Sequence, residues 1–180
     1  TTTVASLGAA FAELGKRVLL VDLDPQGGLT FSLGIDPEDL DVTVGEVLLG
    51  KAKPSDAIVV TEDGMHLLPS NVTGTQAEEA LVSRTGREQR LRVALDKVAD
   101  DYDLVVIDCP PTLGVLTVGA LSASQKVVIP LQAETPATSS SVIPVQPDSG
   151  ASSARYSSAS SPTAEALMRI GRSLETRVTA

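Results

Sequence analysis

Three aspartates follow short apolar runs in this sequence, in a pattern that could hold a divalent cation. Asp22 and Asp24 follow the run 18–21, and Asp108 follows the run 104–107. Paired carboxylates repel each other and lose hydration when buried, so they need a cation or hydrogen-bond donors opposite them. An acid at the end of a strand can hold Mg²⁺ through water, and the metal can bridge phosphates. The pattern therefore predicts a phosphate-handling site.

A purely structural interpretation of the first two acids is also open. Asp22 and Asp24 could form Asx hydrogen bonds in a turn before Pro25. The segment VVIDCPP, which contains Asp108, matches the Walker B pattern of apolar residues followed by an acid. Many α/β strands end in Asp, so this pattern alone is not specific. Two such strands together suit a nucleotide-hydrolysing site.

Composition restricts the class of protein. The chain has 180 residues, 42% of them apolar and 2% aromatic, so its core must consist of Val, Leu, Ile and Ala, and stacking on bases is disfavoured. One Cys and one His argue against a disulfide framework or a Cys/His metal site, which favours a cytosolic protein. The formal net charge of −9 disfavours binding of the whole surface to nucleic acid or anionic membrane.

The predicted elements favour an α/β fold. A helix is predicted before residue 15, and the apolar runs 18–21, 104–107 and 127–130 are typical of strands buried on both faces. Further elements are predicted as helices at 42–50 and 85–99 and as a strand at 65–70. This alternation predicts a parallel sheet covered by helices on both faces. Asp24 and Asp108 would then lie at its carboxyl edge, where ligands bind in such sheets.

The composition changes near residue 135. Residues 135–163 contain ten serines and few large apolar side chains, which predicts a flexible segment. Residues 164–180 are predicted to form a C-terminal helix, because Leu167, Ile170 and Leu174 fall on one stripe. This helix is expected to dock on the core rather than on a membrane, since the stripe is short and lacks aromatic residues.

Three segments resemble the ParA/Soj family of chromosome- and plasmid-partitioning ATPases, which are P-loop NTPases with a deviant Walker A motif. They are TTTVASLGAAFAELGKRVLLVDLDPQGG, REQRLRVALDKVADDYDLVVIDCPPTLGVLT and ALSASQKVVIPLQAE. The resemblance covers residues 1–134, which would form a partial ATPase domain. Of the family motif K-G-G-V-G-K-T-T-T, the sequence has only the three threonines at its start.

This departure from the family pattern leads to further expectations. The resemblance implies that a central first strand and both motif lysines precede residue 1. It also implies that part of the C-terminal half is absent, including the region that supplies the basic DNA-binding surface. The fold is therefore expected to be incomplete, and the chain as printed is expected not to hydrolyse ATP.

The resemblance implies a role for each candidate site residue. Thr1 would ligate Mg²⁺ through its hydroxyl, and Thr2 would contact the α-phosphate of ATP. Asp22 and Asp108 would hold metal-bound water, and Asp24 would orient or activate the attacking water. Family members hydrolyse ATP slowly as sandwich dimers, bind DNA nonspecifically in the ATP state and respond to a ParB-type partner. The implied protein is a cytoplasmic, nucleoid-associated homodimer without a membrane partner.

Two other functions remain open. A MinD-like membrane-cycling ATPase belongs to the same superfamily, but the DPQG sequence at 24–27 favours the ParA type, and the tail lacks a basic amphipathic anchor. A catalytically inactive protein that acts only through partners is supported by the absence of the motif lysines.

Other notable side chains have simpler interpretations. Four arginines could form a phosphate-binding patch, although a solvated helix face is favoured; they are Arg84, Arg87, Arg90 and Arg92. Cys109 is interpreted as a small buried side chain and His66 as a structural residue.

Overall fold

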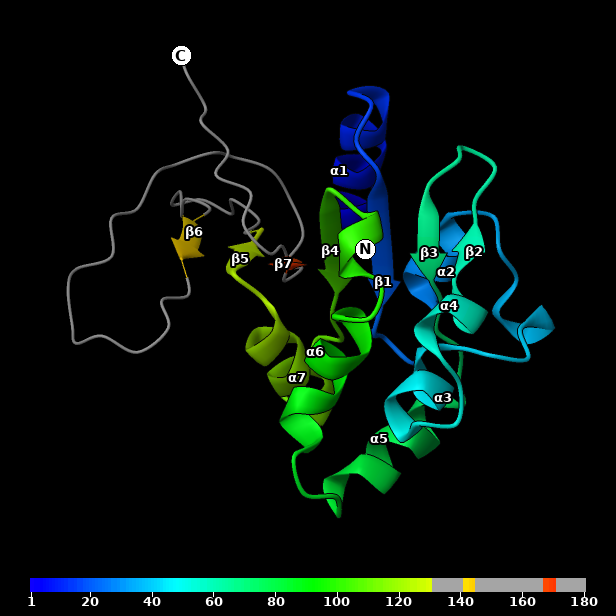
Figure 1. The fold of residues 1–180 in the computed structure, drawn as a ribbon, viewed down its shortest axis with the longest axis vertical. Helices are drawn as coiled ribbons and strands as arrows, with labels where there is room; N and C mark the ends of the chain where they lie inside the picture. Colours follow the sequence, from blue (N-terminus) through cyan, green and yellow to red (C-terminus); the bar gives the residue numbers. More distant parts are fainter. Residues whose placement is uncertain (131–140, 145–166, 171–180) are drawn as a thin grey trace, which may run out of the picture.

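A mixed sheet runs through the part of the chain that the computed structural model describes, which is residues 1–130, 141–144 and 167–170. Within these residues the sheet has seven strands in the order β2-β3-β1-β4-β7-β5-β6 (Figure 1). The strands are β1 (Val18–Asp22), β2 (Val59–Val60), β3 (His66–Leu68), β4 (Leu104–Asp108), β5 (Lys126–Ile129), β6 (Ser141–Pro144) and β7 (Leu167–Ile170).

Seven α-helices and three short 3-10 helices accompany the sheet in the same described residues. The α-helices are α1 (Thr2–Glu13), α2 (Gly28–Ser32), α3 (Val44–Leu49), α4 (Pro54–Ala57), α5 (Gly74–Val82), α6 (Arg90–Leu95) and α7 (Val115–Ala123). The 3-10 helices are η1 (Pro37–Asp39), η2 (Arg87–Gln89) and η3 (Ala99–Asp101). The helix expected at 85–99 is therefore shorter than predicted and begins with a 3-10 turn.

The centre of the sheet matches the prediction. Strand β1 pairs in parallel with β3 on one side and with β4 on the other. Every residue of β1 and β4 is buried, as the continuous apolar runs indicated. The helix predicted at 42–50 is α3, and it ends at Gly50, whose φ of 76° is the left-handed cap that glycine adopts at low cost.

Helices pack on both faces of this sheet, as predicted. Successive side chains of a strand point to opposite faces, so Leu19 and Val21 of β1 pack with the cluster that contains α3, α5, α6 and α7. Val18 and Leu20 pack in a second cluster with α1 and α2. Helix α1 approaches β1 closely at Gly8, where a Cβ would lie 2.8 Å from a methyl group of Leu20.

The other side of the sheet differs from the prediction. The segment predicted at 127–130 is found as β5, but β5 does not pair with β4 in the described residues. Strand β7 lies between them and pairs antiparallel with both. Strand β5 therefore runs in the same direction as β4, but among the described residues the two strands are not hydrogen-bonded to each other. Strands β2 and β6 add further antiparallel pairs at the two outer edges. The sheet is thus parallel only around β1.

The helix predicted at 164–180 is wrong for residues 167–170, which form β7. A physical reason is that β4 and β5 each present an edge of backbone N–H and C=O groups, and one strand between them satisfies both edges. In the segment predicted to be flexible, residues 141–144 form β6. The remaining residues of both predicted segments lie outside the described part of the chain.

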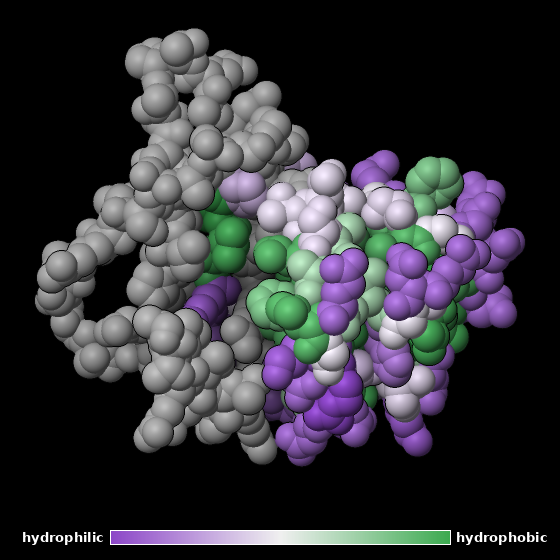
Figure 2. Space-filling model, turned by 90° about the horizontal axis from the view of Figure 1, so that it is seen from above, coloured by the Kyte–Doolittle hydropathy of each residue, from purple (hydrophilic) through white to green (hydrophobic). Residues whose placement is uncertain are grey.

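The surface of the described part is mixed in polarity. Several large apolar side chains are exposed, including Leu14, Phe31 and Leu113. On the face shown in Figure 2, hydrophilic and apolar side chains are interspersed. In the described residues, no helix is long and apolar enough to cross a membrane.

Candidate functional site

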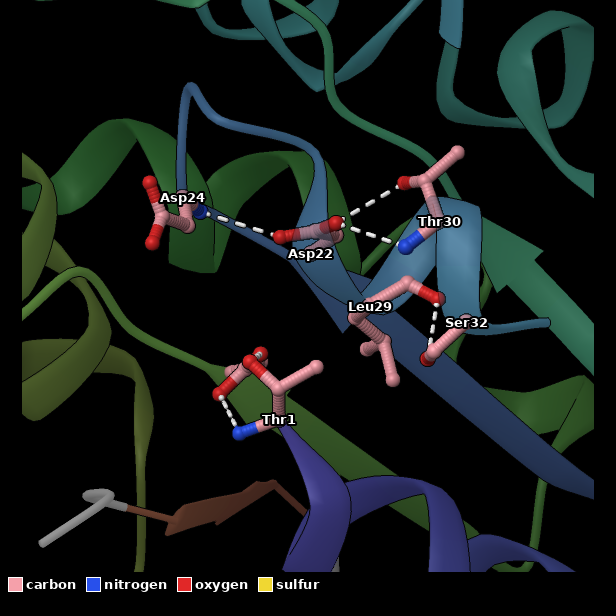
Figure 3. Close-up of polar contacts among 7 residues, drawn as sticks. Thr1, Asp22, Asp24, Leu29, Thr30 and Ser32 are labelled. Carbon is pink, nitrogen blue, oxygen red and sulfur yellow. Dashed lines mark hydrogen bonds and ion pairs between the residues drawn. The ribbon is translucent and has the colours of Figure 1, made fainter. Parts of the chain in front are cut away.

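The candidate site lies at the carboxyl edge of the parallel strands. Asp22 is the last residue of β1 and Asp108 the last residue of β4, and the two are partners in the register of this pair. Thr1, which precedes α1, lies at the same edge because it contacts Asp108 (Figure 3). The fold therefore brings together Thr1 and Asp108, which are 107 positions apart.

Asp22 is fully buried and accepts three hydrogen bonds. Its Oδ2 accepts from the backbone N–H of Thr30 at 2.9 Å and from the Thr30 hydroxyl at 2.8 Å. Its Oδ1 accepts from the backbone N–H of Asp24 at 3.1 Å. Burial is the main cause that raises the pKa of Asp22 from 3.8 to about 6, and the charge of Asp108 adds to it, while the Thr30 bonds act in the opposite direction.

Asp108 is held by Thr1. The Thr1 hydroxyl donates to Asp108 Oδ2 at 2.8 Å, and the Thr1 amino group lies 3.1 Å from Oδ1. Only 1% of Asp108 is exposed. A hydroxyl group that donates its proton to a carboxylate can also offer its oxygen to a cation, so this contact is compatible with Thr1 as an oxygen ligand.

Asp24 lies in the turn that follows β1. Its Oδ1 accepts from the backbone N–H of Gln26 at 2.9 Å, and its carbonyl accepts from Gly27 N–H at 2.9 Å. Asp22 and Asp24 therefore each form the Asx hydrogen bond that the structural interpretation predicted. Asp22 also lies beside Asp108, so the acids cluster as well. The Asp24 carboxylate is half-buried and points away from that of Asp22 (Figure 3).

Gly27 shapes this turn. Its φ of 64° is left-handed, and a Cβ there would lie 3.0 Å from Pro37 and 3.1 Å from the carbonyl oxygen of Ser70. Only glycine fits this position without strain. Gly27 is the N-cap residue of α2, and the first turn of this helix places Thr30 against Asp22.

The donor set suits Mg²⁺ held partly through water. Magnesium prefers oxygen ligands and keeps several waters in protein sites. Thr1, Asp22 and Asp108 offer only oxygen atoms. Among the described residues, no group of three or more His, Cys, Asp or Glu side chains is placed to hold a metal directly. The residues therefore fit a metal bound through one hydroxyl, with the two acids acting through water.

The structure brings together some predicted site residues and not others. Thr1, Asp22 and Asp108 converge, whereas Thr2 is exposed at the first residue of α1. Sequence reasoning missed Thr30, because a threonine between Leu29 and Phe31 belongs to no motif of its own. The available signal was its position shortly after two glycines that follow an acidic turn.

Two of the four arginines named above make structural contacts with α3. Arg84 donates to the carbonyl of Leu49 at 3.2 Å, and Arg90 donates to that of Leu48 at 3.0 Å, so both cap the end of α3. Cys109 is buried, and burial raises the pKa of its thiol to about 12.

His66 lies away from the acids. Its Nδ1 lies 2.7 Å from the hydroxyl of Tyr102, and the two rings meet edge to face. The structural interpretation of His66 and Cys109 agrees with these contacts.

Comparison with known proteins identifies the family. A model of the AAA_31 family, described as an AAA domain, matches residues 1–143. Sporulation initiation inhibitor protein Soj of Bacillus subtilis is 47% identical over 135 residues, which cover 74% of this chain and 53% of Soj. The chromosome partitioning protein ParA of Myxococcus xanthus is 43% identical over 135 residues, which cover 74% of this chain and 48% of ParA. The chain thus spans about half the length of the curated relatives it matches.

A solved structure agrees with this assignment at the level of the fold. It is described as cobyrinic acid a,c-diamide synthase of Mycobacterium smegmatis with bound ATP analog and magnesium. It is 60% identical in sequence, has a TM-score of 0.73 and is matched over 74% of this chain and 55% of that one. The predicted α/β fold of the P-loop NTPase type is confirmed. The chain belongs to the AAA_31 family and, by its likeness to Soj and ParA, to the ParA/Soj-type P-loop ATPases.

Proposed function

We propose that this protein is a partitioning ATPase of the ParA type, which binds ATP with Mg²⁺ and hydrolyses it slowly as a dimer switch on nucleoid DNA. The observation that carries the proposal is the pairing of Asp22 with Asp108 at the carboxyl edge of the sheet, with the Thr1 hydroxyl donating to Asp108. The solved structure described as holding an ATP analog and magnesium supports the choice of ligands.

Each site residue has a proposed task. Thr1 contributes its hydroxyl oxygen to the metal, Asp22 and Asp108 hold metal-bound water, and Thr2 contacts the α-phosphate. Asp24 orients or activates the attacking water, an interaction that is needed in the transition state. When bound, Mg²⁺ supplies positive charge that offsets the charge on the phosphates.

The proposed partners follow from the relatives. Soj and ParA are named for sporulation control and chromosome partitioning. We therefore propose a second copy of the chain, nonspecific DNA in the ATP state and a ParB-type protein as partners, and a cytoplasmic, nucleoid-associated location.

The experiment compares the 180-residue chain with the product of its complete gene. Binding of a fluorescent ATP analogue is measured with Mg²⁺ and with EDTA, and ATP hydrolysis is measured with and without DNA and a ParB-type partner. We expect Mg²⁺-dependent binding and slow, partner-stimulated hydrolysis in the complete product. Asp108→Ala should abolish the Mg²⁺ dependence, whereas Asp39→Ala, at an exposed residue of η1, should not. Absence of any Mg²⁺-dependent binding would exclude the proposal.

A second candidate function comes from the name of the 60% identical structure, which describes a diamide synthase acting on cobyrinic acid. Adding cobyrinic acid and glutamine or ammonia to the hydrolysis assay tests this candidate, because stimulation and an amidated product would favour it over partitioning.

A further inference from the structure

We infer that Thr30 is a positioning residue that occupies one oxygen of Asp22, leaves the other for the proposed Mg²⁺–ATP site, and ties Asp22 to the segment that follows β3. The inference rests on the proposed function for its final consequence. It starts from a chain of hydrogen bonds that links the backbone of Ser70 through Thr30 to Asp22.

The chemistry of a hydroxyl group fixes which atom donates in each of these hydrogen bonds. Thr30 Oγ1 accepts from the backbone N–H of Ser70 at 3.1 Å and lies 2.8 Å from Asp22 Oδ2. A hydroxyl has one proton, and an ionised carboxylate can only accept, so the Thr30 proton must point at Asp22. Thr30, Ser70 and Asp22 are each 1% exposed or less, so water does not compete for these bonds.

The contacts leave one oxygen of Asp22 for a ligand. A carboxylate has about four lone-pair directions, two on each oxygen. The backbone N–H and the hydroxyl of Thr30 both point at Oδ2 and fill its two directions. Oδ1 accepts from Asp24 N–H and has one direction left. Thr30 therefore leaves Oδ1 as the Asp22 oxygen with an unfilled hydrogen-bonding direction, which a metal-bound water would have to use.

The backbone rather than the side chain of Ser70 makes the link. The Ser70 Oγ is buried and has no hydrogen-bond partner in the described part of the protein. The carbonyl oxygen of Ser70 lies 3.1 Å from where a Cβ on Gly27 would be, so the segment after β3 packs directly against the turn that contains Asp24. A displacement of this segment would act on Thr30 and thereby on Asp22.

The test compares four variants with the wild type in the product of the complete gene. Thr30→Val removes the hydroxyl but keeps the shape, and Thr30→Ala removes it with less volume. Thr30→Ser keeps the hydroxyl and should restore function. Ser70→Ala is the matched control, because it keeps the backbone N–H that donates to Thr30.

The main measurement is the Mg²⁺ concentration required for binding of a fluorescent ATP analogue, set against binding in EDTA. We expect Thr30→Val and Thr30→Ala to raise the required Mg²⁺ concentration about 10-fold or more, in the range found when partners of metal ligands are removed. Binding of the analogue in EDTA should change much less than binding with Mg²⁺. A merely structural defect would instead weaken binding under both conditions. Thr30→Ser and Ser70→Ala should behave like the wild type.

A second measurement, amide hydrogen exchange at Ser70, does not depend on nucleotide. The Ser70 N–H should exchange slowly in the wild type, in Thr30→Ser and in Ser70→Ala, and faster in Thr30→Val. Fast exchange in the wild type would overturn the inference even if the hydroxyl-free variants did not fold. If the wild type binds with Mg²⁺ and Thr30→Val requires no more Mg²⁺ than the wild type, only this inference fails. If the wild type shows no Mg²⁺-dependent binding, the proposed function fails as well.

Discussion

Asp22 and Asp108 end two adjacent parallel strands as register partners, and neither side chain is more than 1% exposed. Two carboxylates so placed cannot both carry charge at low cost unless a cation or donors oppose them. Asp108 accepts from the hydroxyl of Thr1. Asp22 has only neutral donors, from Thr30 and from the backbone of Asp24. Burial of Asp22 is the main cause that raises its pKa above the ordinary value.

The first prediction is a pH dependence of stability. Burial and the charge of Asp108 raise the pKa of Asp22 from 3.8 to about 6. The folded protein keeps this proton up to about pH 6, whereas the unfolded chain releases it near pH 3.8. The raised pKa of Asp22 therefore stabilises the folded state fully below pH 3.8, and this stabilisation is lost as the pH rises to about 6. A shift of this size corresponds to about 3 kcal/mol.

The measurement is urea unfolding of the metal-free protein and of Asp22→Asn between pH 4 and pH 7. Asn does not titrate, so the unfolding free energy of the wild type minus that of the variant should fall by about 2 kcal/mol over this range, because part of the effect lies below pH 4. A difference that stays constant or rises with pH would contradict the assignment.

The second prediction concerns Asp24. In the product of the complete gene, Asp24→Ala should slow ATP hydrolysis by a factor of about 100 or more, in the range given for positioned proton-transfer groups. The affinity for ATP should change much less, because the proposed contact is made to the attacking water. Single-turnover hydrolysis and equilibrium binding separate the two effects, with Asp39→Ala as the control at an exposed acid. Loss of affinity with an unchanged rate per bound ATP would show that Asp24 has another role.

The third prediction isolates the close packing at Gly27. Gly27→Ala and Gly34→Ala both place an alanine at a positive φ, of 64° and 81°. Only at Gly27 would the new Cβ meet other atoms, at 3.0 Å from Pro37 and 3.1 Å from the Ser70 carbonyl oxygen, whereas nothing lies within 4 Å at Gly34. Gly34→Ala should cost about 1 kcal/mol for the backbone conformation, and Gly27→Ala should cost about 1–3 kcal/mol more because it overpacks the turn. Equal losses in urea unfolding would show that the turn adapts.

Sequence patterns predicted the parts of the site that depend on regular periodicity. The apolar runs before Asp22 and Asp108 identified two buried parallel strands, and parallel strands must bring their carboxyl ends to one edge. Thr30 could not be predicted in this way, since its contacts to Asp22 and Ser70 depend on the turn at Gly27 and on a residue 40 positions away. Hydrogen-bond partners of this kind follow no spacing rule.

Strand β7 was mispredicted for a related reason. Leu167 and Ile170 are three residues apart, which suits a helical stripe, and a short apolar segment carries no clear preference between helix and strand. The strand forms against β4 and β5, whose ladders come from distant parts of the chain. Strand preference depends on such neighbours more than on the segment itself.

The last prediction tests the position of β7 through its backbone. Met168 is the register partner of Ile107 in β4 and of Val127 in β5, so it lies between two ladders. Proline has no N–H, so Met168→Pro removes a donor from the interior of the sheet and leaves a carbonyl on one neighbour without its partner. An unsatisfied buried group costs about 1–3 kcal/mol. Met168→Ala changes the side chain but keeps the N–H, so it is the matched control. Urea unfolding should show Met168→Pro less stable than Met168→Ala by about 1–3 kcal/mol, with faster amide exchange in β4 and β5. Equal stability of the two variants would mean that residue 168 is not paired on either side in solution.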